Sequence, residues 1–384
     1  MADASPSGKP KPGRLRVQWP PPPIPATTIL RPKPVNPNED RKEIQDQPAA
    51  VDNPVQYKPP PVPNNPSPVQ LVPEQREDEH KVEETQARLD NARHQPPAPQ
   101  VPTDKWMPKK RKNIEKLGEG AFGIVYKCCD TDSLRLFAAK ETIIRDQADM
   151  QIAENEVERL KCLNHKHVVE YYGSVKEHNA IVIYMEYFPA GSLRDMIDNV
   201  GALEESTAIA YIRQILDGLA YIHSMLILHC DLKCANLLLD GHGSVKIGDF
   251  GIAVQMCLDN ANQSVFMLGA VGGGGTLYWM APEVIRQEKD SQGKYGRTAD
   301  IWSLACTIVE MLTTLPPYCI EYSSEARFMG AMCTNSLSYK AKEIVPDASV
   351  PMQLFLSRLF VYDPKDRLRY GADAKEKFQE EFPP

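Results

Sequence analysis

The alternation of apolar and polar positions becomes regular only after about residue 109. Three short runs rich in β-branched and aromatic residues follow, and they predict strands over 114–120, 124–129 and 136–142. The next segment, 148–163, has the composition of a helix. This part of the chain is therefore expected to begin with a small sheet and one helix.

Helical periodicity dominates farther along the chain. Five apolar residues recur in alternating steps of four and three and predict one buried helical face: Ala208, Ile212, Ile215, Leu219 and Ile222. Residues 301–312 are apolar on nearly all sides, which is typical of a helix at the centre of a lobe, and residues 237–239 and 245–248 predict two short strands. Strands first and helices later is an α+β order.

The first 108 residues have a different composition. They hold 25 of the 34 prolines, and proline removes a backbone donor and disrupts helix interiors and central strands. Such a segment cannot build a packed core, and the charged stretch 74–93 is expected to form at most a transient, solvated helix. The sequence thus predicts a disordered proline-rich segment over 1–108 and one folded domain over 109–384.

Charge and cysteine usage narrow the class of protein. The formal net charge is -7, which does not favour nucleic acid or an anionic membrane as the main partner. The nine cysteines form no paired framework, as in proteins kept reduced inside the cell. No apolar run approaches the ~18 residues of a membrane span, and the N-terminus resembles neither a signal peptide nor a myristoylation site. We expect a cytoplasmic protein, with the nucleus not excluded.

Residues 229–251 carry the most informative motif. His-Cys-Asp-Leu-Lys-Cys-Ala-Asn is followed by Asp-Phe-Gly, which matches the signature H-R-D-L-x-x-x-N…D-F-G at every position but one. Phosphoryl transfer from ATP needs a carboxylate that orients the attacking hydroxyl, and Asp231 fits this role. It also needs an amide and a carboxylate to hold magnesium, and Asn236 and Asp249 fit that one. Lys233 follows Asp231 within reach of the γ-phosphate.

A glycine-rich stretch precedes this motif and reads G-x-G-x-x-G-x-V. Its candidate nucleotide-binding residues are Gly118, Glu119, Gly120, Ala121, Phe122, Gly123 and Val125. Glycines allow backbone amides to approach a phosphate closely. A dinucleotide-binding fold has a similar pattern but opens a helix at this point, whereas here β-forming residues follow. A strand-turn-strand cover over phosphates is therefore favoured over a dinucleotide site or an ordinary hairpin.

Lys140 lies in Phe-Ala-Ala-Lys on the third predicted strand, close to the V-A-I-K pattern. A buried ammonium group there needs anionic partners, which ATP phosphates and a helix carboxylate would supply. We choose Glu156 as that carboxylate because Leu160, one turn on, keeps the same inward face; Glu154 and Glu158 are the rivals.

The end of the domain offers a second candidate ion pair. Ala281-Pro-Glu283 closes the segment that Asp249 opens, and Glu283 and Arg367 are expected to form a buried pair. Loss of one partner from such a pair costs ~3–5 kcal/mol.

Together, residues from about 110 to 380 resemble a complete eukaryotic protein-kinase domain, and within that family the MAP kinase kinase kinases of the MEKK type. The matching stretches are residues 164–173, 185–193, 275–284 and 295–311. The resemblance implies a two-lobed kinase fold, with a small antiparallel β-sheet lobe with one helix over about 109–187 and a larger helical lobe over about 188–384. It also implies ATP and Mg²⁺ as cofactors and Ser/Thr phosphorylation of MAP kinase kinases.

The resemblance extends to further site residues. It implies that Met185 is the gatekeeper, that Glu186 to Phe188 form the adenine-binding hinge, and that Thr276 helps to position Asp231. Leu117, Ala138 and Leu238 are the remaining nucleotide contacts that it implies.

Two departures from the family pattern concern activation. Cys230 stands where arginine is usual, and that arginine ordinarily pairs with a phosphate on the activation segment. Gly272 to Gly275 occupy the usual acceptor region, and Ser264 is the only Ser or Thr between Asp249 and Thr276. We therefore expect activity that does not require phosphorylation of this segment; the alternative is that Cys230 is a neutral substitution and that Ser264 or Thr276 still acts as a switch.

Two other functions remain as alternatives to an active kinase. A kinase-like scaffold would be expected to lack at least one of Lys140, Asp231, Asn236 and Asp249, and all four are present. A proline-rich adaptor would work chiefly through residues 14–26 or 55–68, whose polyproline stretches are suited to a proline-recognition domain.

Overall fold

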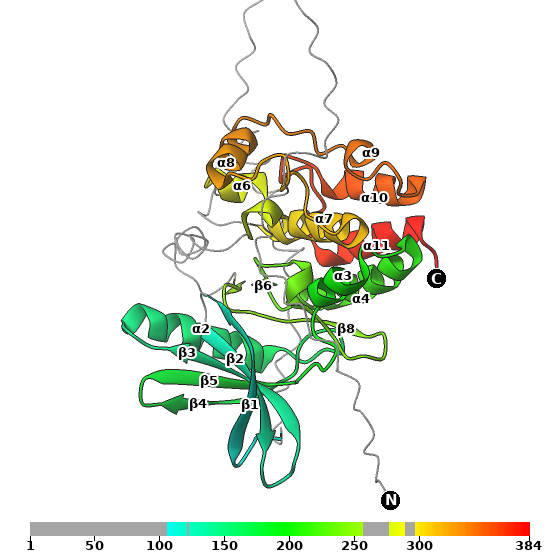
Figure 1. The fold of residues 1–384 in the computed structure, drawn as a ribbon. Helices are drawn as coiled ribbons and strands as arrows, with labels where there is room; N and C mark the ends of the chain where they lie inside the picture. Colours follow the sequence, from blue (N-terminus) through cyan, green and yellow to red (C-terminus); the bar gives the residue numbers. More distant parts are fainter. Residues whose placement is uncertain (1–105, 121–122, 256–275, 289–295) are drawn as a thin grey trace, which may run out of the picture. The chain divides into compact units, whose positions relative to one another are not determined.

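The computed structural model describes residues 106–120, 123–255, 276–288 and 296–384, which lie in one compact unit of the chain. The smaller of its two lobes is built on an antiparallel sheet with the strand order β1-β2-β3-β5-β4 (Figure 1). The strands are β1 (Arg111–Gly120), β2 (Gly123–Asp130), β3 (Leu136–Ile143), β4 (Tyr171–Glu177) and β5 (Ala180–Met185). The three strands predicted at the start of the domain are confirmed, each one to three residues longer than expected at one or both ends.

Helix α2 (Gln147–Cys162) packs across β3, β4 and β5, and its bounds lie within one residue of the predicted 148–163. The Asp146 side chain caps its first turn by accepting from the Asp149 amide. Ala153, Val157 and Leu160 are buried against the sheet.

The sheet separates two apolar clusters because side chains alternate across each strand. One face joins the main core, for example through Ile183. The other face carries a cluster of its own, made of Cys128, Phe137, Ala139, Tyr172, Val182 and Tyr184, which we call the outer cluster.

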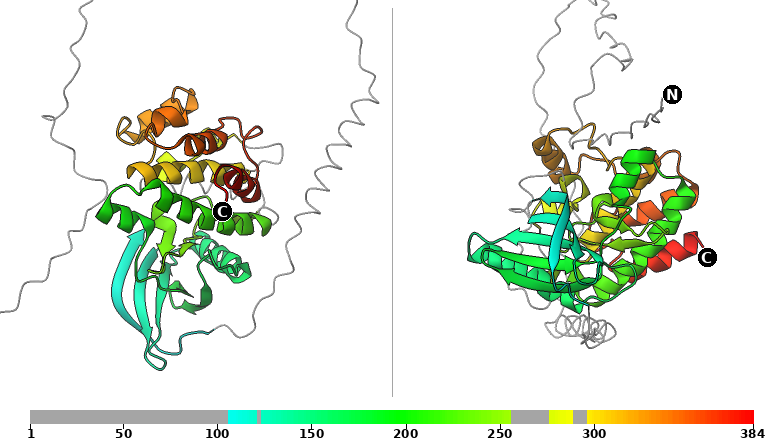
Figure 2. Two further views of the ribbon diagram at one scale, coloured as in Figure 1. Left: turned by 90° about the vertical axis from the view of Figure 1, so that its right-hand side faces the viewer. Right: turned by 60° about the horizontal axis from the view of Figure 1, so that its bottom comes forward.

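The larger lobe is mainly helical (Figures 1 and 2), and its described residues also form two short two-stranded sheets. Its longer helices are α3 (Leu193–Val200), α4 (Glu205–Ser224), α7 (Thr298–Thr313), α8 (Glu325–Cys333), α10 (Val350–Leu359) and α11 (Gly371–Glu381). Its short elements are β6 (Ile227–Leu228), η1 (Cys234–Asn236), β7 (Leu237–Leu239), β8 (Val245–Ile247), β9 (Val254–Gln255), η2 (Thr276–Trp279), α6 (Pro282–Ile285) and α9 (Ala341–Ile344).

Helices α4 and α7 form the centre of this lobe. The five residues of the predicted helical face of α4 have no exposed surface. Residues Thr298 to Met311 of α7 are buried on every side of the helix, as the sequence predicts for 301–312, and β7 and β8 are also confirmed. A two-lobed α+β kinase fold therefore describes the domain.

Some expectations fall on parts of the chain outside the described residues. The expected disorder of segment 1–108 falls outside them as far as residue 105, as does the expected transient helix over 74–93. The residues Ala121, Phe122, Ser264 and Gly272 to Gly275 also lie outside them. Among the described residues, no helix is long and apolar enough to span a membrane.

Candidate active site

Lys140 joins the two lobes at the centre of the site. From β3, its Nζ atom lies 2.7 Å from Oε1 of Glu156 on α2 and 2.9 Å from Oδ1 of Asp249 in the larger lobe. Lys140 and Glu156 are both buried. The pair expected from the sequence is therefore present, and Glu156 rather than Glu154 or Glu158 provides the carboxylate.

The charges of these three groups compensate one another. Burial alone would lower the pKa of Lys140, but the carboxylates of Asp249 and Glu156 outweigh it and raise that pKa. Burial would raise the pKa of Asp249, but Lys140 lowers it to about 2. Burial raises the pKa of Glu156 despite the opposing charge of Lys140. The ammonium group thus keeps Asp249 ionised, the state in which a carboxylate can bind a metal ion.

The loop of residues 229–236, the expected catalytic loop, brings three further predicted residues together. Lys233 Nζ lies 2.9 Å from Asp231 Oδ2 and donates to Thr276 Oγ1 at 2.8 Å. Asn236 Nδ2 donates to the backbone oxygen of Asp231 at 2.7 Å and to its Oδ2 at 2.8 Å. Burial raises the pKa of Asp231, which makes its carboxylate a better proton acceptor than an exposed one.

Asp300 on α7 fixes the backbone of this loop through hydrogen bonds. Its carboxylate accepts hydrogen bonds from the amides of His229 and Cys230, both at 2.8 Å, and lies 2.9 Å from Nε2 of His223. Cys230 adopts a positive φ of 66°, a conformation that non-glycine residues rarely adopt. The His229 ring, 2.9 Å from the Gly248 oxygen, extends the contact to the residue before Asp249.

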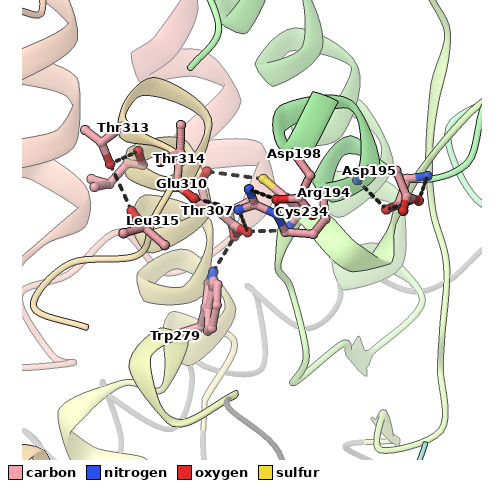
Figure 3. A network of polar contacts seen from close by, with 12 residues as sticks. Arg194, Asp195, Asp198, Cys234, Trp279, Thr307, Glu310, Thr313, Thr314 and Leu315 are labelled. Atoms are coloured by element: carbon pink, nitrogen blue, oxygen red, sulfur yellow. Dashed lines mark hydrogen bonds and ion pairs between the residues drawn. The ribbon is translucent and has the colours of Figure 1, made fainter. Parts of the chain in front are cut away.

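A second buried carboxylate on α7 supports the other end of the loop (Figure 3). Glu310 accepts hydrogen bonds from the Cys234 amide at 3.0 Å and from Trp279 Nε1 at 3.1 Å. Arg194 on α3 donates to it at 3.0 Å and also to the Thr314 oxygen. With these donors Glu310 is satisfied on all sides, so its role in this structure is to fix η1, η2 and α3 together.

The glycine-rich strands are placed next to Lys140. Val125 on β2 pairs with Lys140 on β3. Gly123 has a φ of 120°, and a Cβ atom there would lie 2.1 Å from the Glu141 oxygen, so only glycine fits. Among the described residues, no atom outside the adjacent residues lies within 4 Å of a Cβ built at Gly118 or Gly120. Leu117 to Gly120 lie on β1 and are largely exposed.

The expected hinge follows β5. Met185 pairs with Ala138 of β3, so the expected gatekeeper and the expected adenine contact are neighbours. Glu186 forms an ion pair of 2.7 Å with Lys246 on β8. Phe188 is buried. Leu238 on β7 pairs with Lys246 on β8.

Protein kinases use ATP with a divalent metal ion, and the chemistry of two residues fits such an ion. Asp249 and Asn236 offer oxygen ligands, which hard divalent cations prefer. The described residues contain no cluster of three or more histidine, cysteine or acidic side chains that could hold a metal by itself.

Glu283 and Arg367 form the buried ion pair expected from the sequence. Their two contacts are 2.7 and 3.1 Å long, and Arg367 also donates to the Thr298 oxygen at 2.9 Å. The pair therefore ties α6 and the start of α7 to the segment that follows α10.

Sequence reasoning missed Asp300, Glu310, His223 and Lys246. The first two had a signal, because they are carboxylates at the ends of an otherwise apolar helix, where a buried charge needs a specific partner. Lys246 had none, since alternation along a three-residue strand does not distinguish an ion-pairing lysine from a solvated one.

The fold and the assembled lysine, aspartates and asparagine define a protein kinase. The protein kinase domain family matches residues 111–382, and the chain belongs to this family.

Within the family the chain is similar to MAP kinase kinase kinases. It is 43% identical over 219 residues to the human mitogen-activated protein kinase kinase kinase 3, covering 55% of this chain and 33% of that protein. It is 38% identical over 239 residues to the kinase kinase kinase ANP1 of Arabidopsis thaliana, covering 60% and 34%. With the kinase kinase kinase A of Dictyostelium discoideum the identity is 35% over 258 residues, covering 65% and 26%. The matched part of the chain thus spans only about a quarter to a third of the length of these relatives.

Proposed function

We propose that this protein is a serine/threonine kinase of the MAP kinase kinase kinase type. The single observation that carries the kinase activity is the position of Lys140, which contacts Glu156 and Asp249 at once; the type within the family rests on the similarity to MAP kinase kinase kinases. This contact joins the helix of the small lobe, the strand that faces the nucleotide and the metal-binding loop. A scaffold without catalytic activity would not need the three groups to meet.

In the proposed reaction the γ-phosphoryl group of ATP passes to a Ser or Thr hydroxyl of a protein, and ADP leaves. Asp231 orients the hydroxyl group and accepts its proton. Lys233, bonded to Asp231 and Thr276, offsets the charge that develops on the transferred group. Lys140 aligns the phosphates while Glu156 holds it in place.

Asn236 and Asp249 would bind Mg²⁺, which neutralises charge on the triphosphate when bound. The nucleotide would be covered by residues 117–125 and would contact Ala138, Met185, Glu186, Phe188 and Leu238. Direct backbone contacts from the glycines are supported by the space at Gly118 and Gly120, which no atom of the described residues fills.

The substrate class is tested with a panel of catalytically inactive MAP kinase kinases. We expect the purified chain to incorporate phosphate into at least one of them, and Lys140→Met to abolish incorporation. Lys161→Met, which makes the same chemical change at an ion-paired but more exposed lysine of α2, is the matched control. A MAP kinase kinase whose activation-segment hydroxyls are replaced by alanine should not be labelled.

Two results would contradict the proposal. Equal labelling by wild type and Lys140→Met would mean that the chain is not the source of the activity. If the chain labelled generic proteins but labelled no MAP kinase kinase above background, it would be a protein kinase of another type.

We also propose a cytoplasmic location, with the nucleus as the alternative. All eight cysteines of the described residues are free thiols, which supports a reducing compartment.

The proposed partner of the proline-rich segment 1–108 is a proline-recognition domain that binds residues 14–26 or 55–68. Peptides of these two segments should show saturable binding to a WW, EVH1-type or related domain, and variants with their prolines replaced by alanine should not.

A further inference from the structure

Residues Trp106 to Lys110 precede the match to the kinase family, which begins at residue 111, yet they are packed against the small lobe. The Trp106 ring lies edge-on to Phe137 at 5.7 Å and to Tyr172 at 5.2 Å between ring centroids. Edge-to-face contacts at these distances are favourable beyond the apolar area that they bury. Trp106 thus covers the outer cluster of the sheet.

Arg135 holds the tryptophan in this position. Its guanidinium carbon lies 4.4 Å from the centroid of the Trp106 ring and 4.7 Å from that of Tyr172. Its Nη2 atom donates to the Tyr172 hydroxyl at 2.8 Å. The arginine therefore binds one ring from the segment and one from β4 at the same time, an arrangement that combines cation–π attraction with a hydrogen bond.

Asp130, at the end of β2, fixes the backbone of the same segment. Its buried Oδ1 atom accepts hydrogen bonds from the amides of Lys109 and Lys110, at 3.1 and 2.9 Å. The Thr131 amide in turn donates to the Lys110 oxygen at 2.9 Å. The segment is thus held at two places, by its backbone at Asp130 and by its ring at Arg135.

Residues that Trp106 covers lie on the same strands as the proposed nucleotide contacts, but on the opposite face of the sheet. Phe137 and Tyr184 of the outer cluster contact each other at 5.5 Å. Each is next in sequence to a residue of the opposite face, Ala138 in β3 and Met185 in β5, which pair with each other. Because alternate residues of a strand point to opposite faces, packing on the outer face sets the position of the strands that carry this pair and Lys140.

We propose that Trp106 is a positioning residue for nucleotide binding, acting through the outer cluster on strands β3 and β5. This inference rests on the proposed kinase function and adds a determinant that lies outside the residues matched to the family. Its physical basis is that a two-sided sheet with one face uncovered loses the packing that restricts the relative movement of its strands.

The test measures nucleotide binding directly, with the full chain and a fluorescent ADP analogue in the presence of Mg²⁺. Trp106→Ala should weaken binding by about three- to tenfold, the scale of one or two aromatic contacts. In turnover assays the KM for ATP should rise by a similar factor while kcat at saturating ATP stays within about twofold. Trp106→Phe, which keeps a ring, should recover most of the affinity, and Arg135→Ala should weaken binding in the same direction as Trp106→Ala.

Phe382→Ala is the matched control. Phe382 is the residue at which the family match ends, and its ring packs on Phe378 of α11 in the larger lobe, with centroids 4.8 Å apart. It should lower the melting temperature without changing nucleotide affinity. If Trp106→Ala behaves in the same way, with a lower melting temperature and wild-type affinity, the inference is wrong and Trp106 only stabilises the fold. If the wild-type chain binds no nucleotide at all, the proposed function fails, and this inference fails with it.

Discussion

The backbone amide of Cys230 donates a hydrogen bond of 2.8 Å to the buried carboxylate of Asp300. The catalytic loop is therefore fixed at this point through its main chain, whatever side chain occupies position 230. This explains how the loop keeps its shape with cysteine where the kinase signature has arginine. Cysteine at position 230 therefore changes the charge of the loop, while the hydrogen bond to Asp300 maintains the backbone conformation.

The first prediction concerns the stability that Asp300 provides. Asp300→Ala leaves two buried amides and His223 without their acceptor, and we expect the free energy of unfolding to fall by about 3–5 kcal/mol. Urea denaturation of the variant beside Asp347→Ala, an exposed carboxylate, measures the difference. A loss below about 1 kcal/mol would mean that water replaces the carboxylate without penalty.

The second prediction is the pH dependence of the same group. Burial favours a higher pKa for Asp300, but the hydrogen bond and charge of His223 lower its pKa below the usual range. A carboxyl group whose pKa is depressed by folding contributes stability above its unfolded pKa of about 4 and loses it as the pH falls toward its folded pKa. Wild type should lose stability below about pH 4 more steeply than Asp300→Asn, as followed by urea midpoints at successive pH values. Parallel curves for the two proteins would contradict the sign of the shift.

The third prediction separates catalysis from folding at Asp249. Asp249→Ala should abolish phosphoryl transfer, because Asp249 is the proposed metal-binding carboxylate, while Lys140 keeps its contact with Glu156. Circular dichroism and the melting temperature should stay close to those of wild type. Near-normal turnover with unchanged magnesium dependence would show that another group binds the metal.

The fourth prediction concerns the Glu283–Arg367 pair. Arg367→Leu leaves a buried carboxylate without a partner, and we expect a loss of about 3–5 kcal/mol in the free energy of unfolding. The double change Glu283→Gln with Arg367→Leu should recover part of this loss, since no uncompensated charge remains. Equal losses in the single and double variants would indicate that the arginine's backbone contacts matter more than its charge.

The fifth prediction is activity without activation-segment phosphorylation. Burial raises the pKa of Cys230 well above its usual range, so a neutral thiol stands where a phosphate-binding cation is usual. The nearby charge of Asp300 raises this pKa further, while that of the buried Arg159 opposes it. Phosphatase treatment and Ser264→Ala should therefore leave turnover within about twofold of wild type. A large fall in turnover after phosphatase treatment would favour a phosphoswitch at Ser264 or Thr276.

The sequence predicts those parts of the domain whose signal is local. The apolar face of α4 repeats with helical period over four turns, and the spacing from Asp231 to Asn236 is fixed within one loop. Lys140 and Glu156 could be paired because both positions have an inward direction that the strand and helix periods determine.

The remaining features depend on contacts between segments far apart in the chain. Asp300 meets Cys230 from 70 residues away, and Trp106 meets Tyr172 from β4. In both pairs, the sequence around each residue gives no indication of the residue that it contacts. Trp106 is the clearer example, because it follows a proline-rich stretch whose composition predicts no packing at all.

The covering of α7 on all sides has a consequence for amide hydrogen exchange. A helix in the middle of a lobe exchanges its amides only through the largest opening of the structure, and the amides of His229, Cys230 and Cys234 donate to carboxylates on that helix. These three loop amides should exchange with solvent deuterium as slowly as the interior of α7, and far more slowly than the amides of the exposed turn between β7 and β8. The segment that would perform the chemistry then belongs to the last part of the molecule to open.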